Sequence, residues 1–300
     1  MNLISERLVL DPAERRNAVR EIIRSAEREL ALSVFRCDDI GVLDELAGAA
    51  RRNVRLRALL TPQAKHWERR MNDLGAVVQS MGAEVSRYAG EHNKYHAKYL
   101  VSDSSRALVA SLNFTRKCFE ETCDFLLLTS HPPTVDGLAR LFDVDSSPDP
   151  VASLELSETL ILGPEQARSR LLEILGRAKR SIRIIDHRVS DPAIVSMLRA
   201  RQSDGITVEV LGRDEIPGRL SHGKMLLVDG LFAAIGSISM SSPSLDCRRE
   251  LAVLVQDPAN VSRLSRFFEE AASARTKGSG FSLEWSPSQR RGDDLADDEE

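Results

Sequence analysis

The chain has 300 residues, of which 42% are hydrophobic and 29% charged, and its formal net charge is −4. This length exceeds one typical domain and predicts either a duplicated domain or two domains. Six acidic residues and two arginines within 286–300 account for the whole net charge. The rest of the chain is therefore close to neutral, which argues neither for nor against a nucleic-acid partner.

Targeting and membrane signals do not stand out in the sequence. The first residues lack the basic flank and apolar run of a secretory signal, and no long uncharged apolar stretch predicts a membrane span. The four cysteines, Cys37, Cys118, Cys123 and Cys247, are too scattered for a disulfide framework, which favours buried free thiols. We expect a cytoplasmic monomer whose contact with a membrane would be peripheral.

Two predicted strands recur at one spacing. Residues 26–35 have the pattern of a helix end that runs into a buried strand, and residues 178–187, 152 positions later, have the same pattern. Residues 54–60 alternate as a half-buried strand does, and residues 206–212 match them at the same spacing. Such a repetition indicates an internal duplication.

The two copies differ by an insertion. At the histidine motifs described below the spacing has fallen to 126, so the second copy lacks about 26 residues. The extra piece is predicted to lie within residues 61–92 and to form a helix followed by a strand. The alternation of strands and helices predicts a layered α/β fold. The segment 143–157, dense in Pro, Ser and Asp, is the predicted linker, and 274–300 predicts a disordered end.

The residues that carry chemistry form one constellation in the first copy. His96 and Lys98 are followed by Asp103, and then by Ser111 and Asn113. The histidine and lysine are predicted to lie on one strand, where side chains two residues apart share a face. We therefore expect the imidazole and the ammonium group to point the same way.

The second copy repeats this constellation at matched spacing, as His222, Lys224, Asp229, Ser237 and Ser239. A single His-x-Lys pair is usually an ordinary surface feature. Its doubling makes catalytic involvement the favoured interpretation.

A carboxylate follows each histidine by 28 residues: Asp124 follows His96, and Glu250 follows His222. A carboxylate that accepts from Nδ1 fixes the tautomer and orientation of an imidazole. We expect each carboxylate to orient the histidine of its own copy.

This set of groups suits cleavage of a phosphodiester through a covalent histidine intermediate. One neutral imidazole attacks phosphorus, and the other, protonated, donates to the leaving oxygen and then serves as base for water or an alcohol. Lys98 and Lys224 would neutralise the non-bridging oxygens, so no divalent metal and no cofactor are expected. The residues suited to hydrogen-bond those oxygens are Ser111, Asn113, Ser237 and Ser239.

The doubled motif resembles the signature of the phospholipase D superfamily, H-x-K-x4-D-x6-G-S/T-x-N. The resemblance covers residues 96–124 and 222–250, and more loosely about 15–273. It implies that His96 is the nucleophile and His222 the acid and base. It also implies that Asp103 and Asp229 are supporting residues.

The resemblance further implies a duplicated α/β fold: two α/β/α lobes with mixed sheets, related by a pseudo-twofold axis, which share one active site. The corresponding divisions are 1–145 for the first lobe, 146–275 for the second and 276–300 for a disordered acidic tail.

Three positions depart from the family pattern. Ala110 replaces the usual glycine, Ser239 the usual asparagine, and Asp124 the usual glutamate, one methylene longer. The shorter side chain of Asp124 is expected to orient His96 less firmly. Since neither histidine nor lysine is lost, an active enzyme is favoured over an inactive relic used for binding.

The leading hypothesis is phospholipase D-type hydrolysis or transphosphatidylation of phospholipids. The alternative is a nuclease of the same family acting on DNA or RNA, which the aromatic content of 5% disfavours, because single-strand binding uses stacking aromatics. Arg248 and Arg249, just before Glu250, are candidate phosphate contacts, and Trp67 is a candidate contact for an acyl chain or base.

Overall fold

The computed structural model describes residues 6–62, 68–92, 94–148, 154, 156–212, 216 and 218–274. The predictions made for Trp67 and for the tail 276–300 therefore concern residues outside the described part of the chain.

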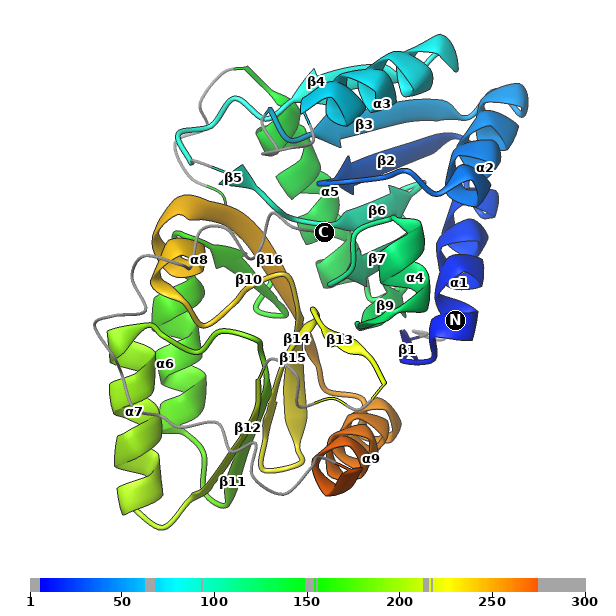
Figure 1. Ribbon diagram of the computed structural model, residues 1–300. Helices are drawn as coiled ribbons and strands as arrows, with labels where there is room; N and C mark the ends of the chain where they lie inside the picture. Colours follow the sequence, from blue (N-terminus) through cyan, green and yellow to red (C-terminus); the bar gives the residue numbers. More distant parts are fainter. Residues whose placement is uncertain are drawn as a thin grey trace.

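The first half of the chain forms a mixed sheet of seven strands in the order β1-β9-β7-β6-β2-β3-β4 (Figure 1). β2, β3 and β4 are parallel to one another, and the other neighbours are antiparallel. Its strands are β1 (Glu6–Val9), β2 (Glu29–Val34), β3 (Arg55–Leu60), β4 (Glu84–Arg87), β6 (Tyr99–Ser102), β7 (Arg106–Ala110) and β9 (Leu126–Thr129).

The second half forms a mixed sheet in the order β10-β16-β15-β14-β11-β12, in which β11 and β12 are parallel. The short β5 (Lys94–Tyr95), from the first half, adds to this sheet by pairing with β16. The other strands are β10 (Leu160–Gly163), β11 (Ser181–Ile185), β12 (Thr207–Leu211), β14 (Lys224–Val228), β15 (Phe232–Gly236) and β16 (Arg248–Val255).

Apart from β4, each strand of the first sheet has a counterpart at the same place in the second sheet, which agrees with the repeat found in the sequence. Among the described elements, α3 (Glu68–Ser80) and β4 are the pair without a counterpart in the second half. They lie within 61–92, so the predicted insertion of a helix and a strand is confirmed. It lengthens one edge of the first sheet beyond β3.

Helices cover both faces of each sheet. In Figure 1, α1 and α2 lie at one side of the molecule and α6 and α7 at the other. α5 packs on β2, β3, β6 and β7, and α9 packs on β14 and β15. The remaining helices are α1 (Pro12–Arg24), α2 (Ile40–Arg51), α4 (Arg116–Glu120), α5 (Pro132–Ser146), α6 (Ala167–Gly176), α7 (Pro192–Ser203), α8 (Ser242–Cys247) and α9 (Pro258–Ala274).

Burial on both faces explains why the central strands are apolar throughout rather than alternating. In β6, Tyr99 and Val101 enter a central core that both halves share, whereas Leu100 enters the core under α1 and α2. In β14, Met225 and Leu226 divide in the same way between the central core and the core of the second half. The central core therefore joins the two sheets.

An ion pair repeats at the spacing of the duplication. Asp39 caps α2 and accepts from Arg16 Nε at 2.9 Å. Asp191 caps α7 and accepts from Arg168 Nη2 at 2.9 Å. Each aspartate satisfies free N–H groups at a helix start and ties that helix to the one before it.

Two boundaries differ from the sequence-based prediction. α5 continues to Ser146, so residues 143–146 are helical and the predicted linker cannot begin before 147. β6 begins at Tyr99 and β14 at Lys224, so both histidines lie just before the strands that were expected to carry them. No described helix is both long enough and apolar enough to cross a bilayer.

Candidate active site

The backbone segments that lead into the two histidines cross between the halves. β5, just before His96, pairs in parallel with the start of β16, which leads into Glu250. In the same way β13 (Leu220–Ser221), just before His222, pairs with β8 (Thr122–Cys123), which leads into Asp124. Each histidine is thus delivered to the carboxylate of the opposite half.

Two short backbone hydrogen bonds fix this crossing. The backbone N–H of His96 donates to the carbonyl of Arg249 at 2.8 Å, and that of Gly223 donates to the carbonyl of Cys123 at 2.7 Å. Gly223 is required by the close approach, since a Cβ there would lie 2.8 Å from the same Cys123 oxygen. The central residue of the second His-x-Lys motif is therefore restricted to glycine by packing.

Both histidines bond to carboxylates of the other half. His96 Nδ1 lies 3.0 Å from Glu250 Oε1, and His222 Nδ1 lies 2.8 Å from Asp124 Oδ1. The expectation that each carboxylate orients the histidine of its own copy is wrong, because the exchanged strands bring the opposite pairs together. The shorter side chain of Asp124 therefore acts on His222 and not on His96.

Hydroxyl groups hold the two carboxylates in turn. Ser111 Oγ donates to Asp124 Oδ1 at 2.5 Å, and Thr122 Oγ1 donates to Asp124 Oδ2. Ser244 Oγ donates to Glu250 Oε2. With their oxygens bonded, both carboxylates are fixed as acceptors for the imidazole Nδ1 protons.

The two motif lysines are buried in the same environment. Lys98 Nζ donates to the carbonyl of His96 at 2.9 Å, and Lys224 Nζ donates to the carbonyl of His222 at 2.6 Å. Burial, together with the positive charge of Lys224, lowers the pKa of Lys98 to about 7. The effect of Lys224 on Lys98 reflects the proximity of the two motifs.

His96 lies among cations. Burial lowers its pKa well below the ordinary value, and Lys98, Lys94, Arg248 and Lys224 act in the same direction. Burial also raises the pKa of its partner Glu250. The imidazole is consequently neutral at neutral pH, the form that can attack phosphorus.

The ring of His96 is also held by packing. Phe35 meets it edge-on with ring centroids 4.6 Å apart, and Lys94 Nζ and Lys98 Nζ lie 4.8 and 5.4 Å from the Phe35 ring centroid. Ammonium groups at such distances are attracted to the aromatic face. Phe35 therefore fixes both the nucleophile candidate and its neighbouring charges.

The opposite pair has a different electrostatic character. Burial would raise the pKa of Asp124, but the charge and hydrogen bond of His222 outweigh burial and lower it. The buried guanidinium of Arg15 adds to this effect, and it donates to the carbonyl of Asp124 at 3.1 Å. Asp124 is therefore an anion suited to stabilising a protonated His222.

The turn residues expected to bind phosphate are placed beside the site, and three of them bond to the protein. Besides its bond to Asp124, Ser111 Oγ accepts from Phe125 N at 2.9 Å. Ser237 Oγ accepts from Leu251 N at 3.0 Å, and Ser239 Oγ donates to Asp186 at 3.0 Å. Asn113 is 2% exposed, and its Oδ1 has no hydrogen-bond partner among the described residues.

The motif aspartates lie in tight turns with positive φ, 52° at Asp103 and 56° at Asp229. Asp103 accepts three backbone N–H bonds of 2.8 Å from residues 27–29, and Asp229 accepts three of 2.7–2.9 Å from residues 179–181. Burial opposes ionisation at both, yet these donors lower the pKa of each carboxyl group. Their contacts agree with the expected supporting role.

Two buried arginines behind the site have structural roles that the sequence did not predict: Arg249 joins the two halves, and Arg15 holds the segment before Asp124 within the first half. Arg249 Nη2 donates to Asp145 Oδ1 at 2.6 Å and Nη1 donates to Glu165 Oε1 at 2.5 Å, so it is not placed as a phosphate contact. Arg15, 0% exposed, donates to the carbonyls of Cys118 and Thr122. Neither arginine is one of the motif's named residues, and it is their burial in the structure that indicates a structural role.

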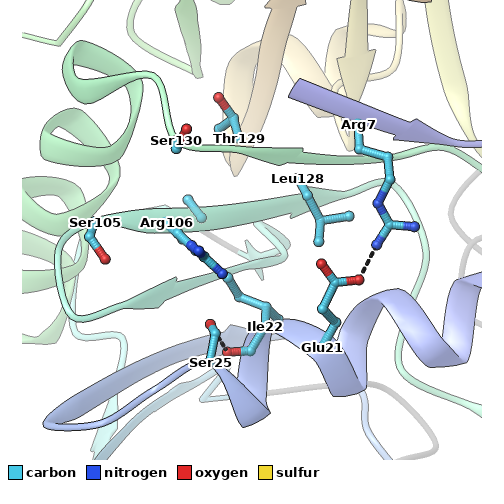
Figure 2. Close-up of a pocket in the computed structure, with 10 residues that line it drawn as sticks. Arg7, Glu21, Ile22, Ser25, Ser105, Arg106, Leu128, Thr129 and Ser130 are labelled. Carbon is cyan, nitrogen blue, oxygen red and sulfur yellow. Dashed lines mark hydrogen bonds and ion pairs between the residues drawn. The ribbon is translucent and has the colours of Figure 1, made fainter. Parts of the chain in front are cut away.

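A cavity of about 620 Å³ lies apart from the histidines, between α1 and the strands β7 and β9. Figure 2 shows Arg106 extending across it toward α1, and Arg7 paired with Glu21 at one side. None of the residues that line it belongs to the two His-x-Lys motifs. The cavity therefore does not form part of the candidate active site.

Comparisons with known proteins identify a related family for the first half of the chain. A family model described as the phospholipase D-like domain of cardiolipin synthase matches residues 19–146. Comparison with curated protein sequences finds no match.

Two solved structures are similar in fold. One is a polyphosphate kinase from Porphyromonas gingivalis, with a TM-score of 0.72 and 18% identity over 89% of this chain and 50% of that chain. This chain thus spans half the length of that kinase. The other is a phosphatidylserine synthase from Haemophilus influenzae, with a TM-score of 0.73 and 12% identity over 91% of this chain and 87% of that chain.

Residues 19–146 therefore match a phospholipase D-like domain, and the chain as a whole shares the fold of those two enzymes.

Proposed function

We propose that this protein is a phosphodiesterase that works without a metal ion, through a phosphohistidine on His96. Its proposed substrate is a phospholipid, whose headgroup is hydrolysed or exchanged for an alcohol. The observation that carries the proposal is the crossed pairing of His96 with Glu250 and His222 with Asp124, at 3.0 and 2.8 Å. Because Nδ1 of each ring faces a carboxylate, the proposed chemistry uses Nε2.

In the first step, Nε2 of neutral His96 attacks phosphorus while protonated His222 donates its Nε2 proton to the leaving oxygen. The phosphorus–oxygen bond breaks as the phosphorus–nitrogen bond forms. Water or an alcohol then loses its proton to His222 and attacks phosphorus, and His96 departs. The cationic surroundings of His96 and the anionic partner of His222 support this division of roles.

The lysines would stabilise charge on the non-bridging oxygens. An ammonium group has three donors, and the bond from each lysine to a histidine carbonyl uses one of them. Lys98 and Lys224 each retain donors for phosphate. Asn113 Oδ1 has no partner among the described residues, and this acceptor can bond a bound water or an incoming alcohol but not the phosphate oxygens.

The phospholipid assignment is supported by two comparisons. The matching family model describes a cardiolipin synthase domain, and the structure that is similar over most of both chains is a phosphatidylserine synthase. A nucleic acid is the second candidate. It is favoured by Lys94 and Arg248, two cations near His96 that lie outside the His-x-Lys motifs, because polyanions bind by charge neutralisation.

The test offers the purified protein labelled phosphatidylglycerol, phosphatidylcholine and single-stranded DNA in separate reactions, all in EDTA. His96→Ala and His222→Ala are compared with His131→Ala, a control histidine at the start of α5 that bonds Thr134 at 2.8 Å. Lipid turnover that both site variants lose and the control keeps supports the proposal. DNA cleavage with the same dependence supports the second candidate, and activity abolished by EDTA contradicts the metal-free mechanism.

A further inference from the structure

A thiol lies beside the His222–Asp124 pair. Cys118, in α4, is 0% exposed. Its Sγ, a carboxylate oxygen of Asp124 and a ring nitrogen of His222 all lie within 4.8 Å of one another. Among the described residues, these are the only three side chains whose metal-ligating atoms lie so close together.

We propose that Cys118, Asp124 and His222 bind a zinc ion and that this ion inhibits the enzyme. The inhibitory part of the proposal rests on the proposed function, whereas zinc binding does not.

The donor set suits zinc. Thiolate sulfur, imidazole nitrogen and carboxylate oxygen are the three ligand types that proteins use for this ion, and three protein ligands leave a fourth position for water or a phosphate oxygen. Zinc bonds of roughly 2.0–2.3 Å place tetrahedral ligand atoms about 3.3–3.8 Å apart. Atoms already within 4.8 Å need only small side-chain shifts to reach that spacing.

The charges balance on binding. Zinc displaces the thiol proton of Cys118 and, when His222 is protonated as the acid catalyst, the proton that its Nδ1 donates to Asp124. Two new bonds to zinc replace those two bonds to hydrogen, and two protons leave with their positive charge. The net charge of the pocket is thus unchanged, so the nearby buried Arg15 does not oppose the exchange.

The duplication provides an internal comparison. The residue 126 positions after Cys118 is Ser244, which donates to Glu250 beside His96. A hydroxyl group is a poor zinc ligand in comparison with a thiolate. The thiol therefore distinguishes the His222 side, and Cys118→Ser introduces a side chain that the same fold already accepts at the corresponding position.

Inhibition follows from which groups the ion engages. With zinc on Nδ1, His222 is a neutral imidazole that holds its Nε2 proton much more tightly than the imidazolium does, so the acid of the proposed mechanism is lost. Zinc on Asp124 also removes the anion that orients that imidazole. Since Cys118 itself has no role in the two-step chemistry, Cys118→Ser should keep basal turnover in EDTA while losing sensitivity to zinc.

The binding test uses cobalt as a spectroscopic substitute, because a cobalt–thiolate bond gives a charge-transfer band in the near ultraviolet. The full chain, freed of metal, is titrated with Co²⁺ and then with Zn²⁺. We expect a thiolate band at one equivalent that zinc displaces, that Cys118→Ser lacks, and that the control Cys247→Ser retains. Cys118→Ala serves in its place should Cys118→Ser unfold. A band that survives loss of Cys118, or no band in the wild type, overturns the site.

The second measurement is turnover against free zinc. Inhibition should require at least about tenfold more zinc in Cys118→Ser than in the wild type, since lost metal contacts cost this much or more in affinity. Equal zinc sensitivity of the two proteins contradicts the inhibitory role. The cobalt spectrum needs no turnover, so failure of the proposed function leaves the binding result readable.

Discussion

Arg249 donates to Asp145 across the two halves of the chain, with Nη2 and Oδ1 2.6 Å apart and side chains only 7% and 1% exposed. Asp145 lies in the last turn of α5, and Arg249 immediately precedes Glu250. The backbone carbonyl of Arg249 also accepts a hydrogen bond from the backbone N–H of His96. The ion pair therefore fixes the carboxylate strand of the second half against the nucleophile candidate of the first.

Removing this arginine should destabilise the fold. Burial raises the pKa of Asp145 and Arg249 opposes that rise, so Arg249→Met leaves a buried acid without its partner. We expect a loss of about 3–5 kcal/mol in the free energy of unfolding, measured by urea denaturation. Arg249→Met combined with Asp145→Leu should recover most of it.

A matched exposed pair serves as the control. Arg116 and Glu120 form an ion pair on α4 with side chains 83% and 42% exposed, and Arg116→Ala should change stability by less than about 1 kcal/mol. Similar losses at positions 249 and 116 would contradict the bridging role of Arg249.

Asp124→Asn should impair both steps in which His222 transfers a proton. The amide cannot stabilise protonated His222 or hold its tautomer, so kcat should fall by about 10²–10⁴-fold. With a substrate whose leaving group needs no proton, His96 still attacks, and a phosphohistidine should accumulate. Phosphorus NMR of the denatured protein detects it.

Glu250→Gln tests the crossed pairing from the other side. This change acts on His96, so it should slow formation of the phosphohistidine and leave little of it to trap. If Asp124→Asn suppressed the intermediate and Glu250→Gln accumulated it, the assigned roles of the two histidines would be reversed.

We expect kcat/KM to fall at alkaline pH because Lys98 loses its proton. With its pKa at about 7, the ammonium group loses its proton as the pH rises above neutrality, and kcat/KM should decline accordingly. Lys98→Arg keeps a positive charge at every accessible pH and should remove this decline, even if its absolute rate is lower. If the decline in kcat/KM persists in Lys98→Arg, another group is responsible for it.

The same lysine should make stability depend on pH in the opposite sense to a lysine whose pKa is raised by an acidic partner. Between pH about 7 and 10.5 the unfolded chain holds a proton on Lys98 that the native chain has released. The free energy of unfolding should therefore rise with pH across that window. Urea denaturation at several pH values checks this, and Lys98→Met should show a shallower slope.

Asp103→Ala should affect stability much more than catalysis. The change removes the acceptor for three backbone N–H groups, which should cost about 1–3 kcal/mol, while kcat per folded molecule stays within about tenfold. Because the pKa of Asp103 is lowered, its contribution is present at neutral pH and is lost as the pH falls below the ordinary value of 3.8. A large fall in kcat with unchanged stability would indicate a chemical role instead.

The sequence predicted the features that periodicity and spacing encode. The duplication and the inserted helix and strand both follow from patterns several residues long. The doubled motif and the 28-residue spacing likewise identified the two histidines and two carboxylates that pair in the structure, whereas the supporting role of Asp103 stays a prediction.

The exchange of carboxylates could not be predicted in this way. β5 and β13 are two residues long, too short to show any period, and each pairs with a strand remote in sequence. Equal spacing within each copy suggested the wrong partners, since it is the same whether contacts form within or between copies. The Arg249–Asp145 pair joins residues 104 positions apart and leaves no local signature either.

The crossing of β5 and β13 makes each half an incomplete catalyst. A chain cut after residue 148 would keep His96 and Lys98 but lose the acid that steadies the imidazole. Such a fragment could regain a carboxylate only by binding a second copy of itself. Joining two copies in one polypeptide therefore makes assembly of the site independent of protein concentration. A mutation in one half can also impair the histidine of the other half.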